Sequence, residues 1–97
     1  MPRHYLELAG FQNANLQGAD LSKTNLTQTN LSGANLSGAV LTNADISQAD
    51  LSNANLEGAN LQGIKADGVT WTGANLKHAA FEYPLDEVAQ AGGAIME

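Results

Sequence analysis

The feature that most constrains this chain is a period of five residues. Between Ala9 and Tyr83, a unit of small residue, Asn or Asp, large apolar residue, Ser or Thr, and Gly recurs fifteen times with some substitutions but without a slip in register. An α-helix turns by about 100° per residue, so residues five apart would spiral around it. A straight strand sends residues an odd number of steps apart to opposite faces. Neither element buries all the large apolar residues, so the chain must bend once in every unit.

The pattern inside one unit assigns an inner and an outer side. The small residue and the large apolar residue are two positions apart, so a short extended segment points both the same way. The Asn or Asp between them points outward, and the Ser or Thr and the Gly form a corner. Stacked turns of the chain pair at about 4.8 Å, as in any sheet. The sequence therefore predicts an all-β solenoid with a narrow core, whose large residues are Phe11, Leu16, Leu21, Leu26, Leu31, Leu36, Leu41, Ile46, Leu51, Leu56, Leu61, Trp71, Leu76 and Phe81.

The number of sides per coil is indicated by the charged residues. If four units make one coil, each residue stacks on the one four units later, so Asp45 lies under Lys65 and Glu57 lies under Lys77. A three-sided coil stacks each residue on the one three units later and would set Glu57 against threonines instead. The opposite charges favour four sides, and fifteen units then make nearly four coils, about 18 Å tall at ~4.8 Å per layer.

The unit Ala-(Asn/Asp)-Leu-(Ser/Thr)-Gly resembles the repeat of the pentapeptide repeat proteins, and the resemblance covers about three quarters of the chain. It implies a right-handed quadrilateral β-helix. Because the family is abundant in cyanobacteria, it also implies a cyanobacterial-like source. Some members of the family imitate DNA and bind DNA gyrase, so the resemblance raises the same role as an alternative here.

The chain divides into an N-terminal cap segment at 1–8, the repeat region at 9–83 and a C-terminal tail at 84–97. Within the tail, a short helix is predicted over 84–91, because Pro84 suits a first helical position and Gly92 and Gly93 end the pattern. The apolar face of this helix is expected to cover the last coil as a cap. A coil end left bare would offer an unpaired edge and favour an end-to-end homodimer.

The repeat is least regular near its ends. Ile64 and Ala66 exchange the usual small and large positions, which conserves the volume of the core. Phe11, Trp71 and Phe81 place aromatic rings in the first and last coils. These rings either form a binding patch or fill end layers that lack a neighbouring layer. The second interpretation is favoured.

No group of residues in the sequence is arranged for catalysis. The units have equal length, so no inserted loop forms a pocket, and the two histidines, His4 and His78, lie far apart in the chain. Asp45 and Asp50 fall on adjacent outer faces and point away from each other. No cysteine and no metal-ligand spacing is present. We therefore expect no catalytic, cofactor or metal site, and no enzyme activity.

Composition restricts the class of partner. The chain carries 10 acidic and 4 basic residues, a formal net charge of -6, which disfavours direct binding to nucleic acid. No apolar run approaches the ~20 residues that span a membrane. The first ten residues lack the apolar core of a signal peptide, so a cytoplasmic location is expected.

These observations predict a non-enzymatic structural or interaction module that presents flat walls to an unknown protein partner. The most regular candidate surface is the column Asn15, Asn35, Asn55 and Asn75. The DNA-mimic alternative fits the charge poorly. Duplex DNA carries roughly 11 negative charges over ~18 Å. The repeat region holds six acidic and three basic residues, a net charge of -3.

Overall fold

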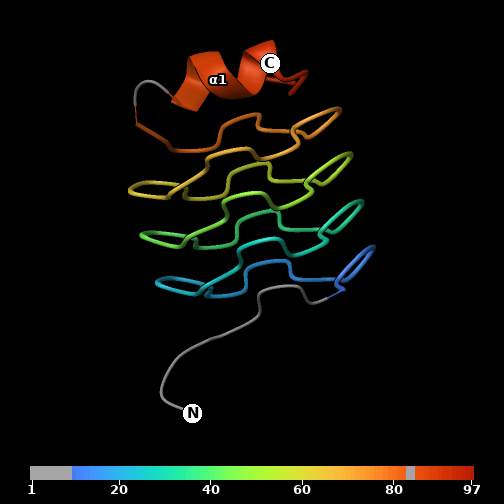
Figure 1. Cartoon of the computed structure of the whole chain (residues 1–97), viewed down its shortest axis with the longest axis vertical. Helices are drawn as coiled ribbons and strands as arrows, with labels where there is room; N and C mark the ends of the chain where they lie inside the picture. The colour runs from blue at the N-terminus through green and yellow to red at the C-terminus, as the bar shows by residue number, and fades with distance from the viewer. Residues whose placement is uncertain (1–9, 83–84) are drawn as a thin grey trace.

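The computed structural model describes residues 10–82 and 85–97. This part of the chain is a stack of coils with one short helix, α1 (Leu85–Ala91), across its C-terminal end (Figure 1). Its strands are single bridged residues rather than longer elements. The expected N-terminal cap segment and His4 lie outside the described residues, as does the junction at 83–84 between the repeat region and the tail.

Each coil has four sides. Parallel bridges, from Gly10↔Asn30 to Asn60↔Ala80, join positions that lie four units apart in the sequence. Asp45 bridges Lys65 in this ladder, as the four-sided prediction requires. The three-sided alternative is therefore wrong. The four sides are named by the centres of their stacked units: wall A holds Phe11, Leu31, Leu51 and Trp71; wall B holds Leu16, Leu36, Leu56 and Leu76; wall C holds Leu21, Leu41, Leu61 and Phe81; wall D holds Leu26, Ile46 and Ala66.

Backbone hydrogen bonds hold the walls together. On wall B, the Leu36 N–H donates to the Asn55 carbonyl at 2.6 Å, and the Asn35 N–H donates to the Ala14 carbonyl at 2.9 Å. Each corner is closed within the unit, as where the Ala39 N–H donates to the Leu36 carbonyl at 3.0 Å. These bonds involve no side chain. The hydrogen bonds between layers therefore do not depend on which residues point outward.

Most corners contain one residue with positive φ, such as Gly38 at 67° and Asn43 at 61°. This left-handed conformation explains why the last residue of the unit is so often Gly, since a Cβ makes the conformation costly. At three corners, the side chain of an Asn in one layer closes over the Gly of the next layer. Asn13 lies over Gly33 in this way, whereas the space around Gly38 is open.

Gly33 and Gly38 have nearly the same φ, so they provide a matched test of this arrangement. Gly33→Ala and Gly38→Ala each place a Cβ at a positive φ, of 68° and 67°, and should each cost about 1–2 kcal/mol. Gly33→Ala should cost more, because its Cβ would meet the Asn13 Oδ1, and the Asn13 side chain would have to move. Thermal unfolding should show the larger fall in Tm for Gly33→Ala, and the excess should vanish in an Asn13→Gly background. Equal melting of the two variants would contradict the stacking of Asn13 on Gly33.

The core is a column of leucines flanked by alanines. The wall centres from Leu26 to Leu61 are fully buried, whereas Phe11, Leu16 and Leu21 in the first described coil are only half-buried. Ile64 and Ala66 are half-buried and pack against the core together, which fits the exchange of small and large positions. The middle of the stack is therefore its best-packed part.

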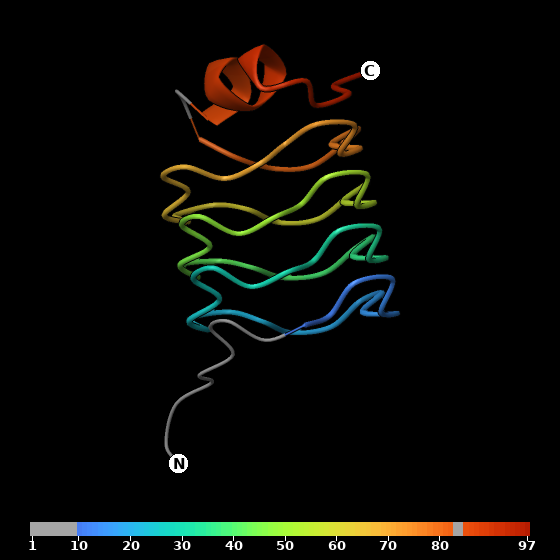
Figure 2. The ribbon, with the colours of Figure 1, turned by 45° about the vertical axis from the view of Figure 1, so that its right-hand side comes forward.

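The C-terminal segment lies over one end of the stack. α1 lies across the last coil, and Ala89 on this helix is 0% exposed (Figure 2). Trp71 of wall A is 2% exposed, and Gly92 packs against its side chain. The seven residues of α1 make a helix about 10 Å long, which crosses the end of the core.

After α1 the chain rejoins wall B as a fifth layer. The Ile95 N–H donates to the Ala74 carbonyl and the Leu76 N–H donates to the Ile95 carbonyl, both at 2.7 Å. Ala94 and Met96 pack against the core in the positions of the small residue and the large apolar residue. Ile95 lies four units beyond Asn75, so the period is kept through the helix. The repeat pattern predicts only a tail here and no fifth layer, because Ile95 stands where the unit has Asn or Asp.

Candidate interaction surface

The outward position of each unit has a local structural role. Asn35 accepts the Ser37 N–H through Oδ1 at 3.1 Å, and Asp45 accepts the Ser47 N–H in the same way at 3.0 Å. A short side chain with an acceptor oxygen is well placed to bond the backbone two residues on. The outward residues that accept this bond within the described chain are Asn15, Asp20, Asn25, Asn30, Asn35, Asp45, Asp50, Asn55, Asn60 and Asn75.

Two substitutions at Asn55 test how much the acceptor oxygen of this side chain contributes to stability. Asn55→Ala should destabilise the fold by about 0.5–1.5 kcal/mol, because the Glu57 N–H loses its 3.0 Å bond to Oδ1. Asn55→Asp keeps an oxygen in that place and should stay closer to the parent stability. Chemical denaturation of the three proteins checks this order. A less stable Asn55→Asp than Asn55→Ala would show that the turn bond is not what the position requires.

The structure brings the four predicted interaction residues into one column on wall B. Bridges join Asn15 to Asn35, Asn35 to Asn55 and Asn55 to Asn75. Asn15 is exposed and the other three are half-buried. In each of them Oδ1 accepts a backbone N–H, at 3.0–3.2 Å. The amide nitrogens are thus the atoms left to face outward.

Wall B differs from the other walls in charge. Its four outward residues from Asn15 to Asn75 are all neutral amides. Each of the other walls carries an aspartate in the same position. The corresponding outward residues are Gly10, Asn30, Asp50 and Thr70 on wall A, Asp20, Val40, Asn60 and Ala80 on wall C, and Asn25, Asp45 and Lys65 on wall D.

The corner between walls B and C has glycine in most of its left-handed positions. Its left-handed positions are Gly18, Gly38 and Gly58, none of which has another atom within 4 Å of the place of a Cβ, followed by His78 in the last coil. The other corners carry larger side chains, as where Gln28 Nε2 donates to Gln48 Oε1 at 2.8 Å. Over these three layers the corner beside wall B therefore carries only the side chains of Gln17, Ser37 and Glu57, each of which precedes one of the glycines.

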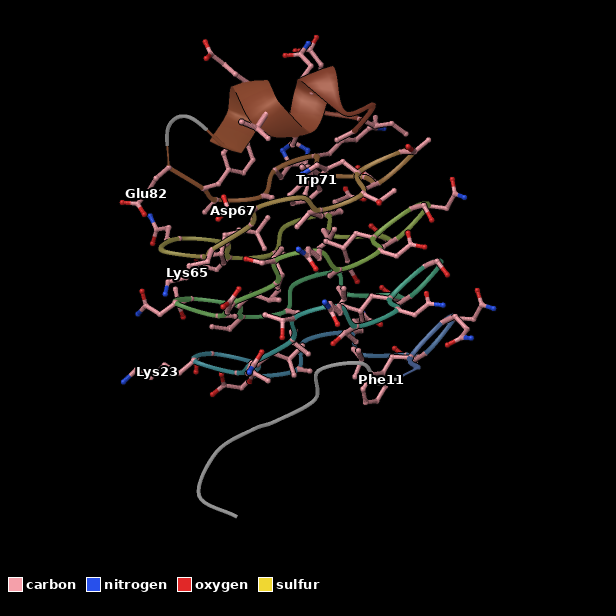
Figure 3. The ribbon with its side chains drawn as sticks, in the orientation of Figure 1. Phe11, Lys23, Lys65, Asp67, Trp71 and Glu82 are labelled. Atoms are coloured by element: carbon pink, nitrogen blue, oxygen red, sulfur yellow. The ribbon has the colours of Figure 1, made fainter. Side chains whose placement is uncertain are left out.

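The charged side chains are spread over several corners and walls. Lys23, Lys65 and Glu82 project from the molecule at different heights of the stack (Figure 3). Glu82 has a structural role, since its Oε1 accepts the Gly63 N–H at 2.8 Å where the chain leaves the ladder. Within the described residues no three His, Cys, Asp or Glu side chains are close enough to hold a metal ion. His78 is exposed at its corner.

The aromatic wall centres lie at the two ends of the core. Trp71 is buried beneath α1 and Phe11 lies in the first described coil (Figure 3). The Trp71 Nε1–H is buried without a hydrogen-bond partner among the described residues. This placement fits residues that fill end layers, and it does not gather the aromatic rings into one binding patch.

No helix in the described part of the chain has the length and apolarity needed to cross a membrane.

Comparison with known proteins identifies several similar chains. A family model described as pentapeptide repeats matches residues 3–28, 19–58 and 54–83. No curated protein sequence matches the chain. Among solved structures, a pentapeptide repeat protein from the Arabidopsis thaliana thylakoid lumen is 31% identical with a TM-score of 0.88, and the match covers 95% of this chain.

Two cyanobacterial structures are also similar in sequence. HetL of Nostoc sp. strain PCC 7120, a pentapeptide repeat protein involved in heterocyst differentiation regulation, is 35% identical over 77% of this chain, with a TM-score of 0.47. Rfr23 of Cyanothece 51142 is 32% identical over 96% of this chain, also with a TM-score of 0.47. The matches span 64% of the Arabidopsis protein, 39% of HetL and 64% of Rfr23, so this chain corresponds to only part of each.

Proposed function

Because the chain belongs to the pentapeptide repeat family, whose members are in general structural or interaction proteins, we propose that it is a non-enzymatic module that presents flat walls to a protein partner. The observation that carries the proposal is the stacking of every fourth unit, which aligns the outward side chains in columns, one of which, on wall B, consists of asparagines. Since the ladder between layers is made of backbone hydrogen bonds, the outward side chains keep atoms that are available for contacts. Extended regular surfaces of this kind suit binding to other proteins.

The ends of the proposed right-handed quadrilateral β-helix have different roles in this proposal. α1 acts as the cap of the C-terminal end, which is supported by the full burial of Ala89 and Trp71. A covered end does not offer its edges to another chain. An end-to-end homodimer would therefore use the other end of the described stack, where Phe11, Leu16 and Leu21 are half-buried.

The wall that binds a partner can be found with one variant per wall. Lys65 shows that the outward position accommodates a lysine, so lysine pairs are suitable probes. Each variant is immobilised and carries two neighbouring lysines on one wall. The wall A variant is Asn30→Lys with Asp50→Lys, and the wall B variant is Asn35→Lys with Asn55→Lys. The wall C variant is Val40→Lys with Asn60→Lys, and the wall D variant is Asp45→Lys beside the native Lys65. We expect one variant to lose a partner that the parent and the other variants capture saturably.

The result that would count against the module is equally specific. If all the variants, each shown by thermal unfolding to be folded, capture the same proteins as the parent, then no wall is the contact surface. If the parent binds nothing saturably, the interaction role itself fails. A cytoplasmic location stays a prediction that cell fractionation would test, and the similar Arabidopsis protein comes from the thylakoid lumen.

The DNA-mimic alternative is less well supported by the charges. Wall B has no charged residue in its outward positions, and wall D carries Lys65 beside Asp45. A surface that replaced DNA would need a dense and continuous negative charge. We therefore expect no inhibition or protection of DNA gyrase in a supercoiling assay with the protein in excess. Inhibition at low micromolar protein would restore the alternative.

A further inference from the structure

We infer that wall B binds a partner that presents carboxylate side chains, and that the amide Nδ2 groups of Asn15, Asn35 and Asn55 receive them. This inference rests on the proposed function, since it takes one wall of the module as the contact surface. It adds the chemistry of the partner, which the repeat pattern alone does not give.

The orientation of these amides follows from the backbone. A backbone N–H only donates, so the atom it meets on the Asn side chain must be the oxygen. The N–H groups of Gln17, Ser37 and Glu57 thus fix Oδ1 of Asn15, Asn35 and Asn55, at 3.2, 3.1 and 3.0 Å. Each Nδ2 then lies on the remaining side of the amide. Within the described residues these three Nδ2 groups have no hydrogen-bond partner.

The Nδ2 groups of the column form a row of hydrogen-bond donors. Successive layers of a sheet are about 4.8 Å apart, so the amide groups recur along wall B at roughly that spacing. The column therefore suits a partner that brings hydrogen-bond acceptors.

The molecule already contains one contact of the proposed kind. The fourth amide of the column, Asn75, donates through Nδ2 to the carboxylate Oε1 of Glu57 at 3.5 Å, a long hydrogen bond. Glu57 projects from the adjoining corner of the layer below and is exposed. Carboxylates form stronger hydrogen bonds than neutral acceptors do. A partner's Asp or Glu side chain would make at the lower layers the contact that Glu57 makes at the top.

Charge favours wall B over the other walls for such a partner. Walls A, C and D hold Asp50, Asp20 and Asp45 in their outward positions. Wall B holds no carboxylate in its outward positions, and Glu57 stands at its adjoining corner. Charges on opposite walls are separated by the core of the molecule, and at physiological salt they are screened beyond about 8 Å.

The test uses substitutions that the fold itself shows to be tolerated. Asp20, Asp45 and Asp50 occupy the outward position and accept the same turn bond as an Asn. Asn35→Asp with Asn55→Asp should thus keep the fold while it replaces two donors by carboxylates. The matched control is Asn30→Asp with Asn60→Asp, which makes the same change of charge on walls A and C.

The probes are two acetylated octapeptides, one alternating Glu and Ser and the other alternating Lys and Ser. Side-chain amide signals in nitrogen-15 NMR spectra report the Nδ2 groups directly. We expect the Glu peptide to shift the signals of Asn15, Asn35 and Asn55 saturably, with at least a tenfold weaker affinity for the wall B variant and about the parent affinity for the control. The Lys peptide should leave these signals in place.

Three results would overturn the inference: no saturable shift with the Glu peptide, shifts confined to residues of another wall, or shifts of the wall B amides by the Lys peptide. None of these decides the proposed function, because the wall-by-wall capture experiment finds a partner of any chemistry. A partner lost with the wall A or wall C lysine variant would keep the module and reject wall B as its surface.

Discussion

Leu36→Asp is expected to abolish cooperative folding. Leu36 is 0% exposed in the second layer of wall B, with Leu16 stacked on one side and Leu56 on the other. A carboxylate there has no partner, so its burial costs several kcal/mol. Losing the packing of the leucine costs about 2–5 kcal/mol more, and the sum is comparable to the roughly 5–15 kcal/mol by which a domain is stable. Circular dichroism during heating should show no cooperative transition at neutral pH.

The neighbouring position supplies the control for this prediction. Asn35→Asp introduces the same side chain one residue earlier, in an outward position that Asp45 fills in the native chain. This variant should melt within a few degrees of the parent. If Leu36→Asp and Asn35→Asp melt alike, then the assignment of inner and outer positions along the units is incorrect.

Ala89→Asp is expected to release α1 from the end of the stack. Ala89 is fully buried, and its carbonyl accepts the N–H groups of Gly92 and Ala94 where the chain turns back to wall B. A carboxylate at this position would be unpaired against Trp71 and the last coil. Exposing a side chain as large as that of Trp71 forfeits about 1.5–3 kcal/mol. The corresponding fall in Tm is roughly 10–20 °C for a domain of this size.

Trp71 reports the release directly, because it is the only tryptophan in the chain. Its fluorescence emission should move to longer wavelength in Ala89→Asp while the coils below stay folded, since each layer of a solenoid depends mainly on its neighbours. Val88→Asp is the control, because Val88 is 51% exposed on the same helix. An unchanged emission spectrum in Ala89→Asp would mean that α1 does not cover Trp71 in solution.

Much of the fold is predictable because the pattern is local and repeated. The two-residue spacing within a unit places Ala34 and Leu36 inside and Asn35 outside, and the backbone ladder then repeats this arrangement in every layer. The stacking of every fourth unit is readable from Asp45 and Lys65. In the described chain these two residues are bridged neighbours, but their charged groups form no ion pair. The charges therefore indicate which units stack without stabilising the stack through an ion pair.

The structure adds features that depend on contacts between layers or on the end of the stack. The repeat pattern does not predict the fifth layer. Its single unit, Ala94 to Met96, follows a helix and has Ile95 in the outward position, where the other units usually have a polar residue. The direction of the wall B amides is also not readable from the sequence, since it follows from hydrogen bonds to the corner N–H groups. Counting four units forward from Asn75 is the signal that would have found the fifth layer.

The four-unit period that runs unbroken from Asn75 through α1 to Ile95 has a consequence for how such a chain can lengthen during evolution. Duplication of four consecutive units adds one full turn, so every wall keeps its own residues and the helix still closes the end in the same orientation. Duplication of a single unit advances everything after it by a quarter turn. The asparagine column would then be divided between two faces, and α1 would leave the stack from another side.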